Sequence, residues 1–181
     1  MIGLTAVVTG GTDGIGAATA LELRRRGANV AIIGRSAAKA DAIVAQAQAQ
    51  ALPGPGSLGA ITTDLSLMAN VVAAGQQLAS ELDHIDLLLG AAGILISRTE
   101  HAAEGMETDF AVGYLSRFVL LETLHRLGAI GVPSRVITIA ASSPKVPSFA
   151  RMEFDDLAVV EARTGMTSHG QAQLANALLT A

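Results

Sequence analysis

The sequence predicts an α/β fold in which a doubly wound parallel sheet carries helices on both faces, and three observations support this prediction. Short apolar segments alternate along the chain with longer segments of helical periodicity. The apolar segments are nearly continuous, as expected of strands that are covered on both faces. Half of the residues are hydrophobic but only 3% are aromatic, so Ala, Val, Leu and Ile must fill the core. Right-handed crossovers then favour the strand order 3-2-1-4-5.

The expected elements follow one another as strand, helix, strand from the N-terminus. The five strands are expected at residues 6–8, 30–33, 58–62, 85–89 and 136–139, of which the third gives the weakest signal. Helices are expected at residues 14–26, 36–51, 67–82, about 100–127 and about 167–180. Gly27 ends the first helix, and Ser36 and Ser66 are expected to cap the second and third. Residues 142–165 show no periodicity, and a loop of this length is often functional.

Length, charge and cysteine content narrow the range of functions. The 181 residues fit one domain, spanning 1–181. A net charge of −4 and a pI near 5.5 give no basic surface for nucleic acid or an anionic membrane. The absence of cysteine excludes disulfides and thiolate sites, and the four histidines lack the spacing of metal ligands. We therefore expect neither a metal site nor a nucleic-acid partner.

The N-terminus lacks the features of a secretory signal, and no apolar segment has the length of a transmembrane helix. The most apolar window, residues 85–96, is too short to span a bilayer and contains Asp86. We therefore expect a cytoplasmic protein without a membrane partner.

A glycine-rich turn follows the first expected strand. It reads Thr9-Gly10-Gly11-Thr12-Asp13-Gly14-Ile15-Gly16 and leads directly into the first expected helix. Such a turn lets backbone approach a pyrophosphate closely, and the helix N-terminus offers free N–H groups and a positive dipole end. A plain tight turn between strand and helix is the alternative. The position between strand and helix favours a dinucleotide site in a Rossmann domain.

Five segments resemble the short-chain dehydrogenase/reductase family in order and spacing. They are the T-G-x-x-x-G-I-G turn, Ile33–Arg35, Asp64–Ser66, Leu87–Gly93 and Gln171–Asn176, and the last is similar to the retinol-dehydrogenase-like branch. The resemblance implies an oxidoreductase that acts with a nicotinamide dinucleotide on a small-molecule carbonyl or alcohol. The residues it assigns to the cofactor are Gly10, Thr12, Asp13, Gly14, Ile15, Gly16, Arg35, Asp64, Leu65, Ala91, Ala92 and Gly93.

Arg35 favours NADP over NAD as the cofactor. An acidic residue at the end of the second strand would bind the ribose 2′-hydroxyl and repel a 2′-phosphate, but Gly34 holds that place. The guanidinium of Arg35 suits a phosphate. Asp13 in the glycine turn counts mildly against NADP. Asp64 either accepts a hydrogen bond from the adenine amino group or acts as a carboxylate at a helix N-terminus.

The family's catalytic tyrosine, lysine, serine and asparagine are not found at the matching positions. His169 stands at the tyrosine position, Gln173 at the lysine position and Gly113 at the asparagine position. The serine position falls on Ala140 or Ala141, with Ser142 one residue later. The catalytic candidates that remain are His169, because a histidine side chain can donate a proton near neutral pH, and Ser142. A surface or capping role is the alternative for His169, and turn residues are the alternative for the serines.

Several functional hypotheses stay open on these residues. The leading one is an NADP(H)-binding oxidoreductase; the second is a catalytically silent cofactor-binding protein or partner subunit; the third is a non-redox enzyme with His169 as acid or base. The chain is also expected to lack the C-terminal strands of the family, as a fragment of a longer enzyme would. By resemblance we expect a homo-oligomer, such as a dimer, paired through the helices near 100–127 and 167–180, where Leu174, Ala175, Leu178 and Leu179 form an apolar stripe.

Overall fold

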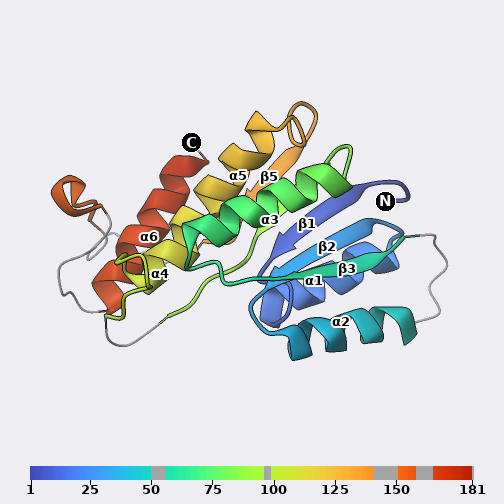
Figure 1. Ribbon diagram of the computed structural model, residues 1–181, viewed down its shortest axis with the longest axis horizontal. Coiled ribbons are helices and arrows are strands. Elements are labelled where there is room, and N and C mark those ends of the chain that lie inside the picture. The colour runs from blue at the N-terminus through green and yellow to red at the C-terminus, as the bar shows by residue number, and fades with distance from the viewer. Residues whose placement is uncertain (50–55, 96–98, 141–150, 158–164, 181) are drawn as a thin grey trace.

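The computed structural model, which describes residues 1–49, 56–95, 99–140, 151–157 and 165–180, confirms the predicted fold class. Five parallel strands form one sheet in the order β3-β2-β1-β4-β5 (Figure 1). They are β1 (Thr5–Thr9), β2 (Asn29–Gly34), β3 (Leu58–Thr62), β4 (Leu87–Gly90) and β5 (Arg135–Thr138). This is the expected order, 3-2-1-4-5, in which β2 and β3 follow on one side of β1, and β4 and β5 on the other.

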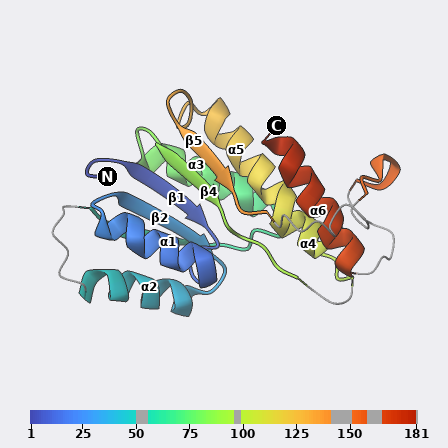
Figure 2. The same ribbon diagram turned by 180° about the vertical axis from the view of Figure 1, so that it is seen from behind.

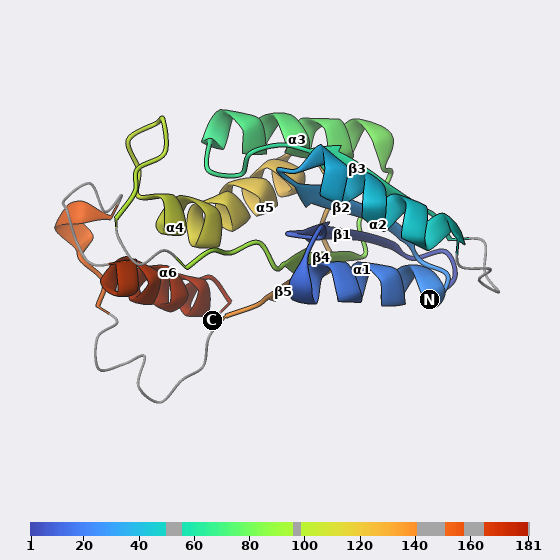
Figure 3. The same ribbon diagram turned by 90° about the horizontal axis from the view of Figure 1, so that it is seen from below.

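Helices cover both faces of the sheet. They are α1 (Gly14–Arg25), α2 (Ala37–Ala49), α3 (Met68–Glu81), α4 (Thr108–Phe110), a π-helical turn (Ala111–Leu115), α5 (Ser116–Arg126), a 3₁₀ turn (Phe154–Asp156) and α6 (Gly165–Leu179). Figure 3 shows α1 beneath the sheet and α3 and α5 above it. One apolar core packs Val7, Ile33 and Leu88 against α3 and α5, and a second packs Val8 and Ile32 against α1.

Local sequence determined most boundaries, with two differences. The expected helix at 100–127 is divided into α4, a π-helical turn around Gly113, and α5. Ser66 does not cap α3, because the helix begins at Met68 and its first N–H donates to the carboxylate of Glu104 at 2.8 Å. The carboxylate of Glu104, from a loop distant in the sequence, therefore caps α3 in place of the expected serine. The side chain of Ser36 does accept from the N–H of Lys39, at 3.4 Å.

Helix α6 lies beside α4 at one end of the molecule (Figures 1 and 2). Its residues Ala172 and Ala175 are buried against Phe110 of α4. The apolar stripe predicted on α6 therefore divides, since Ala175 is covered by the chain's own helix whereas Leu178 is 59% exposed. Leu178 remains available for a contact with another chain.

Candidate functional site

A cavity of about 640 Å³ lies at the carboxyl edge of the sheet, where segments that leave all five strands come together. Crevices outside this edge, at the point where the strand order reverses, are the usual ligand sites of doubly wound sheets. Every residue that the sequence assigned to the cofactor lines this cavity. The structure thus brings together the glycine turn, Arg35, Asp64 and Leu65, and the segment Ala91–Gly93. Lys39, Ile94, Thr108, Val112 and Ile139 are lining residues that the sequence analysis missed.

The glycine turn leaves no room for side chains at two of its positions. A β-carbon on Gly16 would lie 2.2 Å from the carbonyl oxygen of Gly10, because the first turn of α1 packs directly on the turn. A β-carbon on Gly10 would lie 2.7 Å from the Cα of Ala92. The absence of side chains at Gly10 and Gly16 lets the turn lie directly against the first turn of α1 and the segment that follows β4. The first-turn N–H groups of α1, which have no acceptor within the helix, are placed at the edge of the cavity.

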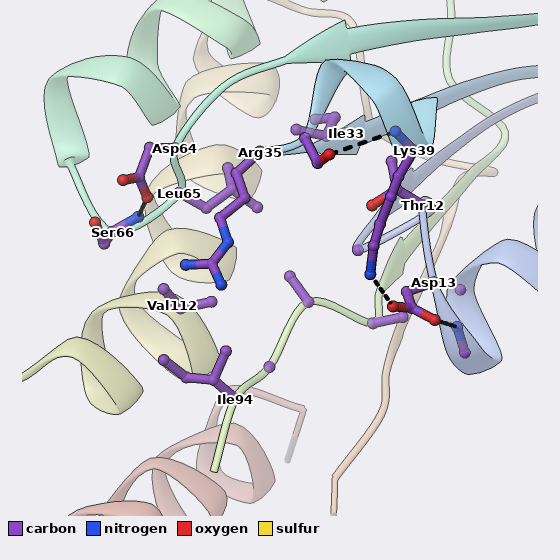
Figure 4. Close-up of a pocket in the computed structure, with 18 of the residues that line it drawn as sticks. Thr12, Asp13, Ile33, Arg35, Lys39, Asp64, Leu65, Ser66, Ile94 and Val112 are labelled. Carbon is purple, nitrogen blue, oxygen red and sulfur yellow. Dashed lines mark hydrogen bonds and ion pairs between the residues drawn. The ribbon is translucent and has the colours of Figure 1, made fainter. Parts of the chain in front are cut away.

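Asp13 caps α1 and also holds Lys39. Its Oδ1 accepts from the N–H of Gly14 at 2.8 Å, and its Oδ2 accepts from the ammonium of Lys39 at 2.5 Å (Figure 4). The hydrogen bond from Lys39, with a smaller effect of the Gly14 N–H, lowers the pKa of Asp13. The expectation that Asp13 counts mildly against NADP stays a prediction. The carboxylate is paired with a cation that the sequence analysis did not consider.

Arg35 follows β2 and is exposed on the cavity wall, where its guanidinium extends over the opening (Figure 4). No carboxylate among the described residues forms an ion pair with it. The neighbouring Gly34 is crowded, because a β-carbon there would lie 2.5 Å from the Cγ2 of Thr12. An acidic side chain at position 34 would therefore have to displace Thr12. The wall of the cavity next to β2 is cationic.

Asp64 forms a turn at the end of the segment that follows β3. Its Oδ1 accepts from the N–H of Ser66 at 2.9 Å, so the carboxylate has a structural role at the rim (Figure 4). This contact is a local turn that precedes α3, whose first residue is Met68, so the role of a carboxylate at the helix N-terminus stays a prediction. The interaction with an adenine amino group stays a prediction.

A buried arginine supports the other end of the cavity. The side chain of Arg117, on α5, donates to the carbonyl of Ala92 at 2.7 Å and to that of Ile139 at 2.8 Å. Burial lowers the pKa of Arg117 to about 10. A β-carbon on Gly90 would lie 3.0 Å from the Cδ of Arg117, so the glycine at the end of β4 makes room for this side chain. A charged residue within an otherwise apolar stretch of helix was the sequence signal for it.

His169 forms a hydrogen-bonded set with two other residues. Its Nδ1 lies 2.9 Å from Oδ2 of Asp109, and its Nε2 lies 3.3 Å from Nε2 of Gln173. Burial raises the pKa of Asp109 to about 6, and the charge of His169 opposes this rise. Neither His169 nor Gln173 is among the described residues that line the cavity. Asp109 is a partner that the sequence analysis missed, because it lies 60 positions from His169.

The other positions matched to the family's catalytic groups offer little polar chemistry. Gly113 lies in the π-helical turn, and a β-carbon there would lie 3.1 Å from Oδ1 of Asp109. Ala140 is exposed, and Ala141 and Ser142 lie outside the described residues. Within the described part of the chain, no cluster of His, Asp and Glu side chains could hold a metal ion. In that same part, no helix combines the length and apolar character needed to cross a membrane.

Comparisons with known proteins agree with this architecture. A family model described as short chain dehydrogenase matches residues 4–152. Human polyprenol dehydrogenase is 30% identical over 97% of this chain and 53% of its own length, and human retinol dehydrogenase 14 is 30% identical over 99% and 56%. The chain thus spans about half the length of the curated relatives it matches.

Solved structures share the fold over nearly the whole chain. An uncharacterised protein from Mycobacterium Paratuberculosis superposes with a TM-score of 0.80 at 28% identity, covering 99% of this chain and 60% of that one. A blue fluorescent protein from a metagenomic library, solved in complex with NADPH, superposes with a TM-score of 0.72 at 26% identity, covering 99% and 66%.

Proposed function

Because the chain belongs to the short chain dehydrogenase family, in its retinol-dehydrogenase-like branch, we propose that it binds NADP(H) and takes part in the oxidation or reduction of a small-molecule alcohol or carbonyl. The observation that carries the proposal is the convergence of all the expected cofactor residues on one cavity at the carboxyl edge of the sheet. A nicotinamide dinucleotide, when bound, supplies or accepts the hydride. The chain's own residues bind and orient it.

Each wall of the cavity fits one part of the dinucleotide. The turn from Gly10 to Gly16 and the start of α1 are suited to the pyrophosphate, since side chains are excluded and N–H groups are presented. Arg35 and Asp64 stand where the adenosine half would lie. Ala91–Gly93, in which the carbonyl of Ala92 accepts from Arg117, would border the nicotinamide half.

The cationic wall favours NADP(H) over NAD(H). Arg35 has no carboxylate partner in the described part of the chain, so its guanidinium is available to a 2′-phosphate. Lys39, in the first turn of α2, adds a second cation. Lys39 is paired with Asp13, but an exposed ion pair contributes little free energy, so a phosphate with greater charge can take Lys39 from Asp13.

His169 is the group we propose to hold the proton that the reaction needs. Oδ2 of Asp109 lies 2.9 Å from Nδ1 and fixes the ring, and Nε2 of the Gln173 amide lies 3.3 Å from Nε2 of the ring. Ser142, which lies outside the described residues, stays a candidate for orienting a substrate carbonyl.

A catalytically silent cofactor-binding protein is the second candidate function, and two observations favour it. Both ring nitrogens of His169 have partners within the chain, and neither His169 nor Gln173 lines the cavity within the described part. General acids contribute about 10²–10⁴-fold to such reactions, so a misplaced one would leave little turnover. On this second candidate function, we expect little or no dehydrogenase activity from this chain.

Binding and turnover should be measured separately. Titration with NADPH, NADH and their oxidised forms, followed by calorimetry or cofactor fluorescence, tests the binding proposal; no binding of any form would overturn it. A panel of carbonyls followed by nicotinamide absorbance then tests turnover in the parent, in His169→Ala and in the double variant His169→Tyr with Gln173→Lys. Turnover by the parent that His169→Ala abolishes would identify His169 as a working acid. Cofactor binding without turnover in the parent would favour the silent protein.

A further inference from the structure

Arg117 is a buried cation directly behind one end of the cavity. Its side chain comes from α5 and the residue is 6% exposed. Its two terminal nitrogens donate to the carbonyls of Ala92, just after β4, and Ile139, just after β5. Both of these residues line the cavity. The guanidinium is therefore separated from the cavity only by the strand ends that it holds.

The position of Arg117 can be related to the two halves of a dinucleotide. This step rests on the proposed function. With the pyrophosphate at the glycine turn after β1 and the adenosine half over β2 and β3, the nicotinamide half must extend over the ends of β4 and β5. Those are the two strand ends that Arg117 supports.

The charge of Arg117 is not cancelled by a contacting carboxylate. Among the described residues it forms no ion pair, and its Nε has no hydrogen-bond partner. The buried acids nearby form their hydrogen bonds with other groups: Asp109 contacts His169, and Oε2 of Glu107 accepts from the N–H of Phe110 at 2.8 Å. Asp109 acts on Arg117 only through space, where its charge opposes the effect of burial on the pKa of Arg117. With a pKa of about 10, the guanidinium is charged at neutral pH.

We infer that Arg117 makes the cavity prefer NADPH to NADP⁺. The nicotinamide ring is neutral when reduced and carries a positive charge when oxidised. A fixed, poorly solvated guanidinium repels the oxidised ring and leaves the reduced ring unaffected. Two unit charges about 10 Å apart, at an effective dielectric constant of about 20–40, change a binding ratio about four- to fifteenfold. The site would accordingly be suited to retaining a reduced cofactor.

The test compares two affinities within each protein. Dissociation constants for NADPH and NADP⁺ are measured by calorimetry for the parent, Arg117→Met and Arg117→Lys. We expect the parent to prefer NADPH, Arg117→Met to lower that preference about four- to fifteenfold, and Arg117→Lys to retain most of it. Adenosine 2′,5′-bisphosphate, which lacks the nicotinamide half, should bind the three proteins equally and so reports any general damage to the site.

The outcomes separate this inference from the proposed function. Equal affinity of the parent for NADPH and NADP⁺ overturns the inference even where Arg117→Met does not fold. The same loss of preference in Arg117→Lys as in Arg117→Met overturns it too, since shape rather than charge would then be responsible. Binding of both cofactors with no preference leaves the proposed function standing, whereas binding of neither overturns both.

Discussion

Replacing Arg35 with alanine should weaken NADPH binding and leave NADH binding nearly unchanged. The guanidinium stands on the cavity wall without a carboxylate partner in the described part of the chain, so its loss removes a charge-assisted contact and frees no other group. Such contacts contribute about 1.5–3 kcal/mol when shielded from water. Arg35 is exposed, which places the expected loss nearer 1–2 kcal/mol, or about five- to thirtyfold in Kd.

The assay is calorimetric titration of the parent and the variant with NADPH and NADH under identical salt. Arg126→Ala is the matched control, because Arg126 is also an exposed arginine near a helix end but lies outside the cavity, paired with Glu122. The control should change neither Kd. An equal loss of affinity for NADPH and NADH in Arg35→Ala would refute the reasoning, since the arginine would then act on the fold rather than on a 2′-phosphate.

Three further predictions concern the turn, the buried acid and assembly. Gly16→Ala should reduce cofactor affinity at least about tenfold and destabilise the fold by about 1–3 kcal/mol, because its β-carbon would lie 2.2 Å from the carbonyl oxygen of Gly10. In the control Gly131→Ala, the new β-carbon meets nothing within 4 Å, so affinity and stability should both stay unchanged. Calorimetry measures the affinity of each variant, and thermal melting measures its stability. Asp109 has a pKa raised from 3.8 to about 6, so the folded state holds the proton of this carboxyl more tightly than the unfolded state does. The free energy of unfolding should therefore fall as pH rises from about 4 to 6. Asp109→Asn should flatten this dependence of stability on pH in melting curves, and an unchanged dependence would exclude Asp109 as its source. Sedimentation at micromolar concentration should give the mass of a dimer or larger assembly, and Leu178→Asp should reduce it; a single-chain mass for the parent would refute the pairing.

The fold and the cavity wall could be predicted because both depend on local pattern. Continuous apolar segments fixed the strands to within two residues at most ends, and strand order followed from crossover handedness. Parallel strands place their carboxyl ends at one edge of the sheet. Residues that follow different strands, such as Gly10, Arg35 and Asp64, therefore lie together at that edge. Spacing along the chain was sufficient for all three.

The polar pairs around the site could not be predicted, because each depends on tertiary packing. Lys39 reaches Asp13 across 26 positions, Arg117 reaches Ala92 across 25, and Asp109 reaches His169 across 60. No periodicity relates residues at such distances. A partial signal of position existed for Lys39, which lies three residues after the capping Ser36 and so at the start of α2, beside the same sheet edge. For Arg117 the signal was its charge within an apolar stretch of helix, which gives no partner.

Two glycines near the cavity pack against charged side chains. A β-carbon on Gly90 would lie 3.0 Å from the Cδ of Arg117, so a larger residue there would require the buried arginine to shift. A β-carbon on Gly113, the position matched to the family's asparagine, would lie 3.1 Å from Oδ1 of Asp109, whose Oδ2 lies 2.9 Å from Nδ1 of His169. Packing in a core this close leaves little free volume. A longer side chain at either glycine would therefore have to move a charged side chain that is held by contacts elsewhere in the fold.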